Sequence, residues 1–206
     1  MERMDQFNEL EISALKELVN IGISHVATAI GEISREKVDI SLPELKNFSK
    51  NELLSLGENN TGIVYAYLRV EGISALTETL IVLTEKQAFE LMEKFVNVEG
   101  CSQVNTKKLS KDEQKSIFSE ISGIITATYF SAVETTFNIK THHGVPEVSF
   151  NHNKTKDFIQ QMLQQEEGML IQVSFSIKGS NLEGKFLLIP DLKTINIFFE
   201  KIGIIA

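Results

Sequence analysis

Apolar residues recur at helical spacing in two long stretches of the chain, one in each half. Within residues 8–32 and just beyond, they are Leu15, Leu18, Val19, Ile23, Val26, Ile30 and Ile33. Positions three and four apart share one face of a helix, so this spacing predicts a long amphipathic helix with Asn8 and Glu11 as its N-terminal capping pair. A second such helix is predicted from Ser110, whose hydroxyl can cap the first free amides, to about Glu134.

Extended segments and shorter helices follow each long helix in the same order. Strict alternation, as in Val173-Ser-Phe-Ser-Ile177, predicts strands with one buried face and one wet face. Each half is predicted to hold an extended stretch through a proline, two further strands and a closing helix. In the first half these are residues 37–48, 62–71, 75–83 and 85–96, and in the second half 140–150, 169–178, 182–189 and 191–202. Short helices over 51–56 and 156–165 are further predictions.

The two halves also align with each other when the sequence is shifted by 103 positions. Matching pairs include Ser13 with Ser116, Glu17 with Glu120, Ala29 with Ala132, Lys37 with Lys140 and Pro43 with Pro146. An ordered series of matches predicts an internal duplication. We therefore expect one α+β domain over residues 1–206, made of repeats at about 8–100 and 110–206. It should have pseudo-twofold symmetry, two long amphipathic helices, two closing helices and about six strands.

The composition disfavours several classes of function. Of the 206 residues 42% are hydrophobic, and the net charge is −8 at pH 7. The hydrophobic fraction disfavours disorder, and a negative charge without a basic patch disfavours nucleic acid as a partner. Apolar runs are broken by charge well short of a membrane span. We predict a cytoplasmic protein that binds neither nucleic acid nor membrane.

No metal site is expected from the residues that usually bind one. Cys101 is the single cysteine, so neither an intrachain disulfide nor a cysteine-based zinc site is predicted. His142 and His143 are neighbours on a predicted strand and would point to opposite faces. No acidic partner stands at a recurring ligand spacing from them.

The side of the first helix opposite its apolar stripe carries a polar set. At 100° per residue, Ser13, Glu17, Asn20 and Ser24 fall at roughly 140° to 200° from Leu15. A carboxylate and a carboxamide three residues apart stand side by side on such a face and can reach another molecule together. An isolated Glu-x-x-Asn pair is far more typical of an ordinary solvated helix face than of a site, so only the surrounding pattern can favour a function.

The surrounding pattern resembles a known family. Ser13-x3-Glu17-x2-Asn20-x22-Pro43 is similar to the signature of the CheC and CheX phosphatases of chemotaxis, in which Asp or Ser, Glu, Asn and Pro occur at these intervals. The run Asn20-Ile-Gly-Ile-Ser-His-Val-Ala-Thr-Ala-Ile30 also looks like the stretch that follows the asparagine in that family. Length and duplication resemble CheC more than the shorter CheX.

The resemblance implies an activity, a partner and a role for each residue. Family members hydrolyse the aspartyl-phosphate of a CheY-like receiver domain, whose own Mg²⁺ is the only cofactor expected. Asn20 would then position the attacking water and Glu17 would pair with the receiver's lysine, with Ser13, Ser24 and Pro43 in support. A CheD-type deamidase is a further implied partner, although no residue here locates its surface.

The second copy departs from the pattern at one position. Ser116-x3-Glu120-x2-Gly123-x22-Pro146 keeps the serine, glutamate and proline, but glycine stands where asparagine should be. Glycine has no carboxamide to hold a water, so we interpret this copy as a degenerate site. Alternatively, Gly123 lets another backbone pack closely against the helix. A half-decayed constellation also keeps open a second function, that of a non-catalytic binding or adaptor module of the same fold, such as a flagellar switch protein or a CheD-binding regulator.

Overall fold

The computed structural model of the chain consists of helices and one antiparallel sheet. It describes residues 6–51, 53, 63–72, 75–97, 103–150 and 155–205. The helices are α1 (Glu9–Ser34), α3 (Glu85–Val96), the 3-10 turn η2 (Thr106–Lys108), α4 (Lys111–Phe137), α5 (Thr155–Met162) and α6 (Leu192–Lys201). The strands are β1 (Val38–Ile40), β2 (Glu44–Ser49), β3 (Ile63–Gly72), β4 (Ala75–Thr84), β5 (Thr141–His143), β6 (Glu147–Ser149), β7 (Glu167–Ile177) and β8 (Glu183–Pro190).

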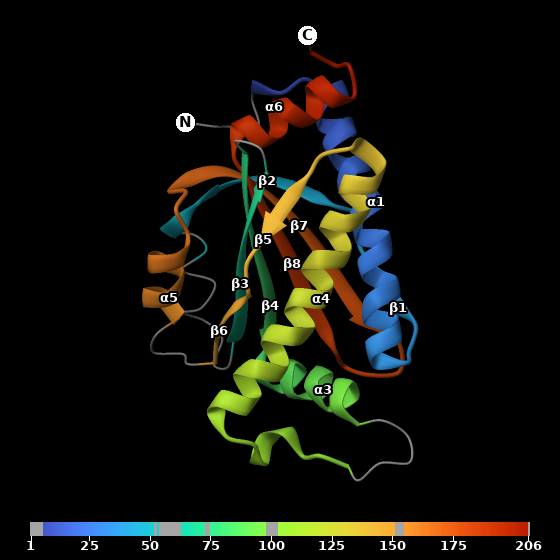
Figure 1. Cartoon of the computed structure of the whole chain (residues 1–206), viewed down its shortest axis with the longest axis vertical. Helices are drawn as coiled ribbons and strands as arrows, with labels where there is room; N and C mark the ends of the chain where they lie inside the picture. Colours follow the sequence, from blue (N-terminus) through green and yellow to red (C-terminus); the bar gives the residue numbers. More distant parts are fainter. Residues whose placement is uncertain are drawn as a thin grey trace.

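The two long helices lie side by side in opposite directions across one face of the sheet (Figure 1). Each begins with a capping box, Asn8 with Glu11 in α1 and Ser110 with Glu113 in α4. Asn8 and Ser110 are the N-cap residues that the sequence predicts. They run on slightly further than predicted, to Ser34 and Phe137. Both then end in a left-handed residue, and these two residues, Arg35 and Asn138, stand 103 positions apart.

Helix α4 is notable for its apolar composition. Among the described helices it is the one that is long and apolar enough, at 27 residues, to span a membrane by length and composition alone. Here its apolar side chains pack inside the fold instead. Those that are buried are Phe118, Ile121, Ile125, Tyr129, Phe130, Ala132 and Val133.

The sheet has the order β1-β7-β8-β4-β3-β5, with β2 also paired to β7 and β6 to β3. The order is symmetric between the two halves of the chain. When β1, β3 and β4 are exchanged with β5, β7 and β8, the same order results, read from the other edge of the sheet. The sheet has eight strands, not the predicted six or so. Each proline-containing stretch forms two short strands, one before and one after its proline. Proline lacks the N–H that a continuous ladder needs. Since β1 and β2 share β7, and β5 and β6 share β3, the sheet is still six strand positions wide.

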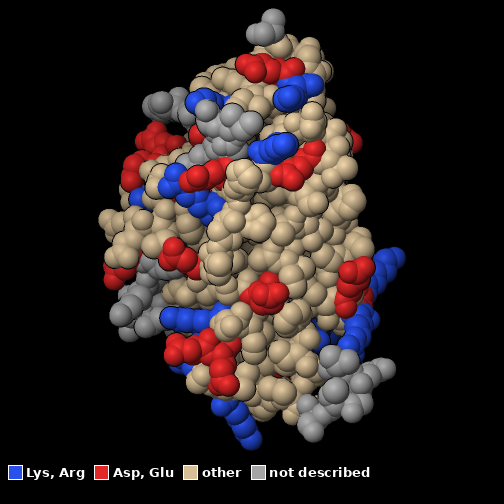
Figure 2. Space-filling model, in the orientation of Figure 1, with Lys and Arg blue, Asp and Glu red and all other residues tan. Residues whose placement is uncertain are grey.

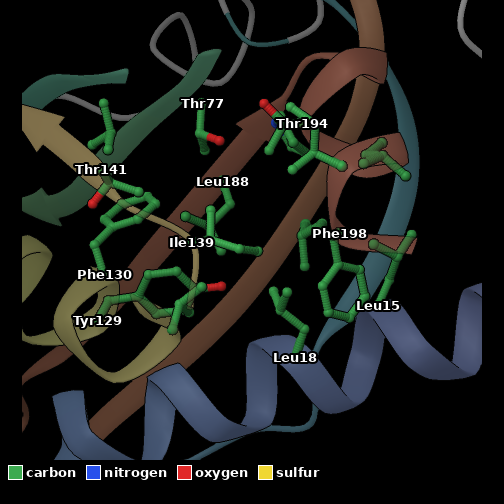
Figure 3. A pocket seen from close by; sticks show the side chains of 16 residues that line it. Leu15, Leu18, Thr77, Tyr129, Phe130, Ile139, Thr141, Leu188, Thr194 and Phe198 are labelled. Carbon is green, nitrogen blue, oxygen red and sulfur yellow. The ribbon is translucent and has the colours of Figure 1, made fainter. Parts of the chain in front are cut away.

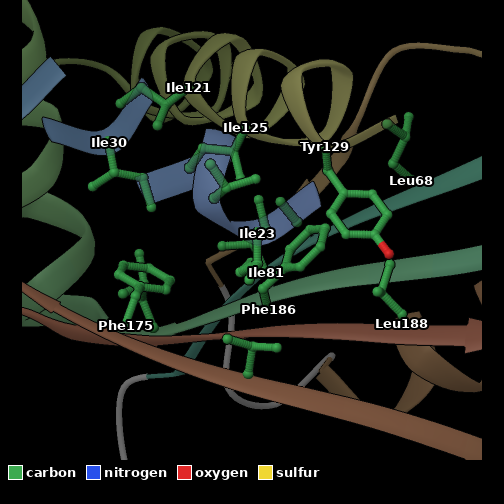
Figure 4. Close-up of a cluster of buried hydrophobic side chains, with 14 of the residues drawn as sticks. Ile23, Ile30, Leu68, Ile81, Ile121, Ile125, Tyr129, Phe175, Phe186 and Leu188 are labelled. Carbon is green, nitrogen blue, oxygen red and sulfur yellow. The ribbon is translucent and has the colours of Figure 1, made fainter. Parts of the chain in front are cut away.

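The main core lies between the sheet and the pair α1 and α4 (Figure 4). Gly22 of α1 allows a close approach between the two long helices, because a Cβ there would lie 2.4 Å from a ring carbon of Tyr129 in α4. The Tyr129 ring is itself packed between Phe130 and Phe186, with ring centroids 5.0 and 5.4 Å away. The bare backbone of Gly22 therefore lets the two long helices come together at this level.

A second apolar cluster covers the other face of the sheet. It includes Tyr65, Leu80 and Leu187 from the strands and Leu163 from the segment after α5. Glu78, which is fully buried, binds that segment. Its carboxylate accepts hydrogen bonds from the backbone N–H groups of Gln164 and Gln165 at 2.7 and 3.3 Å. It also accepts one from the Tyr67 hydroxyl at 2.9 Å. The predicted helix over 156–165 corresponds to α5, which begins at Thr155 and already ends at Met162. The one predicted over 51–56 lies mostly outside the described residues.

Candidate functional site

The polar face of α1 presents its predicted site residues to the outside. Ser13, Glu17 and Ser24 are exposed, and Asn20 is half-buried. The Ser24 hydroxyl donates to the Ile21 carbonyl at 2.8 Å. In the part of the chain that the structure describes, neither the Glu17 carboxylate nor the Asn20 carboxamide has a hydrogen-bond or ion-pair partner. Both groups thus remain available to a second molecule.

The opposite face of α1 fixes where these two side chains stand. Leu15, Val19 and Ile23 are at most 3% exposed and hold the helix to the core. The tight contact at Gly22 lies two residues beyond Asn20. Because the backbone on either side of Asn20 is packed, the Glu17 and Asn20 pair stands on a rigid element rather than on a loop.

Pro43 lies between β1 and β2 and is buried. The residue before it, Leu42, is 79% exposed, and its counterpart in the second half, Val145 before Pro146, is 81% exposed. Sequence reasoning did not single out this pair of apolar residues. The signal was available, since a large apolar residue precedes the proline at both positions related by the 103-residue shift.

The second constellation assembles on α4 in a related way. Ser116 and Glu120 are exposed, whereas Gly123 and Pro146 are half-buried. The Ser119 hydroxyl donates to the Pro146 carbonyl at 2.9 Å and ties the proline segment to the helix.

The interpretation of Gly123 as a site of close backbone packing is wrong. A Cβ there would meet only ring atoms of Pro146, at 3.7 Å, which is ordinary van der Waals contact. Tight packing therefore does not require a glycine at this position. Gly22, not Gly123, is the glycine that a close approach between helices demands.

The surface around these residues is largely uncharged (Figure 2). Between Glu17 and Glu32 α1 has no Asp, Glu, Lys or Arg, and neither does α4 between Glu120 and Glu134. A shallow groove between the two helices is lined by His25, Ala127, Thr128, Ser131, Ala132, Thr135 and Thr136. Glu17 and Glu120 are thus isolated acidic groups at the edge of a neutral surface.

No metal centre forms among the described residues, which contain no group of three or more His, Cys, Asp or Glu side chains placed to hold an ion. His142 and His143 are exposed on β5. Cys101 lies outside the described residues. The chemistry that the site offers is therefore that of one carboxylate and one carboxamide.

Comparison with known proteins shows which proteins the chain is similar to. The model of the CheC-like family matches residues 10–46, which include Ser13, Glu17, Asn20 and Pro43. The chain is also 27% identical to the CheY-P phosphatase CheC of Bacillus subtilis over 146 residues, or 69% of this chain and 68% of that protein. The chain is therefore similar to CheC. The match places the part of α1 that carries Glu17 and Asn20 inside the family model.

Solved structures share the fold of this chain. FliY of Thermotoga maritima superposes with a TM-score of 0.70 at 14% identity, covering 96% of this chain and 98% of that one. CheX in the CheX-CheY-BeF3-Mg²⁺ complex of Borrelia burgdorferi superposes with a TM-score of 0.56 at 11% identity, covering 84% and 96%. The CheC-like fold is thus confirmed, and the roles of individual residues stay predictions.

Proposed function

We propose that this CheC-like chain accelerates hydrolysis of the aspartyl-phosphate of a CheY-type receiver domain. The observation that carries the proposal is the Asn20 carboxamide, which has no partner among the described residues and stands one helical turn from Glu17 on the outer face of α1. The relative from Bacillus subtilis, a CheY-P phosphatase, supports the same substrate class.

Asn20 supplies what hydrolysis of an acyl phosphate lacks. Water must attack in line with the bond to the leaving carboxylate, and catalysis of such a step consists mostly of positioning. The carboxamide oxygen of Asn20 accepts a hydrogen bond from the water, and its nitrogen donates to a phosphoryl oxygen. The group does this without a charge, whereas a carboxylate in its place would repel the phosphoryl anion.

Glu17 acts in docking. Its exposed carboxylate pairs with a lysine of the receiver and fixes the register in which Asn20 enters the partner's site. Ser13, Ser24 and Pro43 support the pair from the same face and the adjoining strand connection. No deep pocket is needed, because the receiver provides the phosphoryl group and its own Mg²⁺.

The neutral surface of α1 and α4 fits this mode of docking. Burying charged side chains against a partner costs desolvation energy, and the stretches beyond Glu17 and Glu120 contain none. At the second copy the same surface lacks the carboxamide, because Gly123 has no side chain. We therefore propose one catalytic site, at Glu17 and Asn20, and none at Glu120 and Gly123.

Phosphate release from a receiver phosphorylated with a small-molecule donor tests the proposal. Asn20→Ala should lower the acceleration about 10²-fold, the contribution expected from positioning one water, with an unchanged melting temperature. Glu17→Ala should raise the protein concentration needed for half-maximal acceleration. Glu120→Ala is the matched control, since it removes the equivalent exposed glutamate from α4, and it should leave the rate unchanged. Full acceleration by the Asn20→Ala variant would refute the assignment.

One observation favours a second candidate function, a binding or adaptor module without catalysis. The constellation on α4 keeps the exposed Glu120 and the exposed Val145 although the carboxamide is absent. A surface of this kind can hold a partner without acting on it. Binding of a phosphorylated receiver with no acceleration by the wild-type chain would select this function. A CheD-type partner and a cytoplasmic location remain predictions.

A further inference from the structure

A cavity of about 80 Å³ lies behind the candidate site, between α1, α4, α6 and the sheet (Figure 3). Its walls are almost entirely apolar, with Leu15 and Leu18 from α1, Leu188 from β8 and Phe198 from α6 among them. Nothing in the proposed phosphatase function uses this space, because Glu17 and Asn20 point from the other side of α1.

Two hydroxyls open into the cavity without a partner. Tyr129 is 2% exposed and Thr77 is 7% exposed, and no hydrogen bond joins either hydroxyl to the described residues. Both face the interior of the cavity in Figure 3. The other two hydroxyls in the wall are occupied, since Thr141 donates to Glu134 at 2.7 Å and Thr194 to Asp191 at 2.6 Å. A buried hydroxyl without a partner costs free energy, so Tyr129 and Thr77 call for a bound group.

The wall also determines the charge and the size of what fits. Among the described residues that line the cavity there is no Asp, Glu, Lys, Arg or His, so a charged ligand would be desolvated without compensation. Burial raises the pKa of Tyr129, whose hydroxyl therefore remains a donor at neutral pH. An apolar cavity of about 150 Å³ takes up benzene in another protein, so a molecule of roughly five non-hydrogen atoms suits this one. Leu18, Ile139 and Ile197 are only half-buried and leave a way in from the surface.

We propose that this cavity binds a small neutral molecule with an apolar body and one hydrogen-bond-accepting oxygen, of the class of short-chain ketones and alcohols. The oxygen accepts from the Tyr129 hydroxyl, and the carbon chain lies against Leu15, Leu188 and Phe198. This inference does not rest on the proposed phosphatase activity.

Ligand-observed NMR on the purified full chain tests the proposal with 2-butanone as the probe. Butyrate and butylammonium, which have similar carbon chains but carry a charge, serve as negative probes. We expect 2-butanone to bind and its affinity to fall about tenfold in the Tyr129→Phe variant. In Ile139→Phe, the added ring narrows the entrance and should reduce binding further.

Tyr65→Phe is the matched control. The Tyr65 hydroxyl is likewise buried without a partner, but it belongs to the cluster on the opposite face of the sheet. This variant should therefore bind 2-butanone like the wild type. Failure of 2-butanone to bind the wild type, which would indicate water alone in the cavity, overturns the proposal. So does equal affinity in Tyr129→Phe, or binding of butyrate as tight as that of 2-butanone.

Discussion

Replacing Gly22 by alanine should destabilise the fold even though alanine is the better helix former. The added Cβ would lie 2.4 and 2.5 Å from two ring carbons of Tyr129, whereas carbon atoms in contact are normally about 3.5 to 4.0 Å apart. The ring would have to retreat by roughly 1 Å. Phe130 and Phe186 pack against the ring and resist this movement.

The size of the effect follows from two opposing terms. Overpacking a buried site costs about 1 to 3 kcal/mol, and we take the upper end because Phe130 and Phe186 pack against the Tyr129 ring. Replacing glycine by alanine within a helix returns about 1 kcal/mol. The net loss for Gly22→Ala is therefore about 2 kcal/mol, which lowers the melting temperature by about 4 to 8 °C in a chain of this length.

Gly123→Ala is the matched control, since it makes the same chemical change in the other long helix. Its Cβ would meet only the Pro146 ring at 3.7 Å, so the helix-forming term stands alone and stabilises by about 1 kcal/mol. Urea denaturation followed by far-UV circular dichroism measures both variants, which suits a chain without tryptophan. Shifts of the same sign in the two variants would refute the packing argument.

Three further predictions concern other parts of the molecule. If α4 presents its face to a receiver as α1 does, adding Gly123→Asn to the inactive Asn20→Ala variant should restore phosphate release, and no recovery would show that only α1 docks productively. Hydrogen bonds from the hydroxyl and amide of Thr141 hold the pKa of Glu134 below its ordinary 4.5. The stability that this contact contributes is present above pH 4.5 and is lost as the pH falls through the lowered pKa. In Glu134→Gln the free energy of unfolding, measured by urea titration at several pH values, should therefore fall less steeply at acidic pH. Glu78→Ala should cost about 3 kcal/mol in the same denaturation assay, because it strands one hydroxyl and two amides, and a loss below about 1 kcal/mol would contradict that role.

Much of the candidate site was predictable because its residues lie on one helix. The spacing of Glu17 and Asn20 places them side by side whatever the rest of the chain does. Their exposure was predicted only in part, since Asn20 is half-buried. Neither the exposure of Leu42 nor the contact partner of Gly123 follows from helical spacing, because both depend on how the proline segments meet the helices.

The sequence by itself determined the long helices and the closing helices of this protein. The capping boxes of α1 and α4 and the helix Glu85–Val96 follow from hydrogen bonds and side-chain periods that span only a few residues. Only the tertiary structure decided the pairing of β7 with β1 and β2, the tight contact between Gly22 and Tyr129, and the cavity into which the Tyr129 hydroxyl opens. These features join residues more than a hundred positions apart, and which atoms fill the space between them is a property of packing that no local pattern encodes.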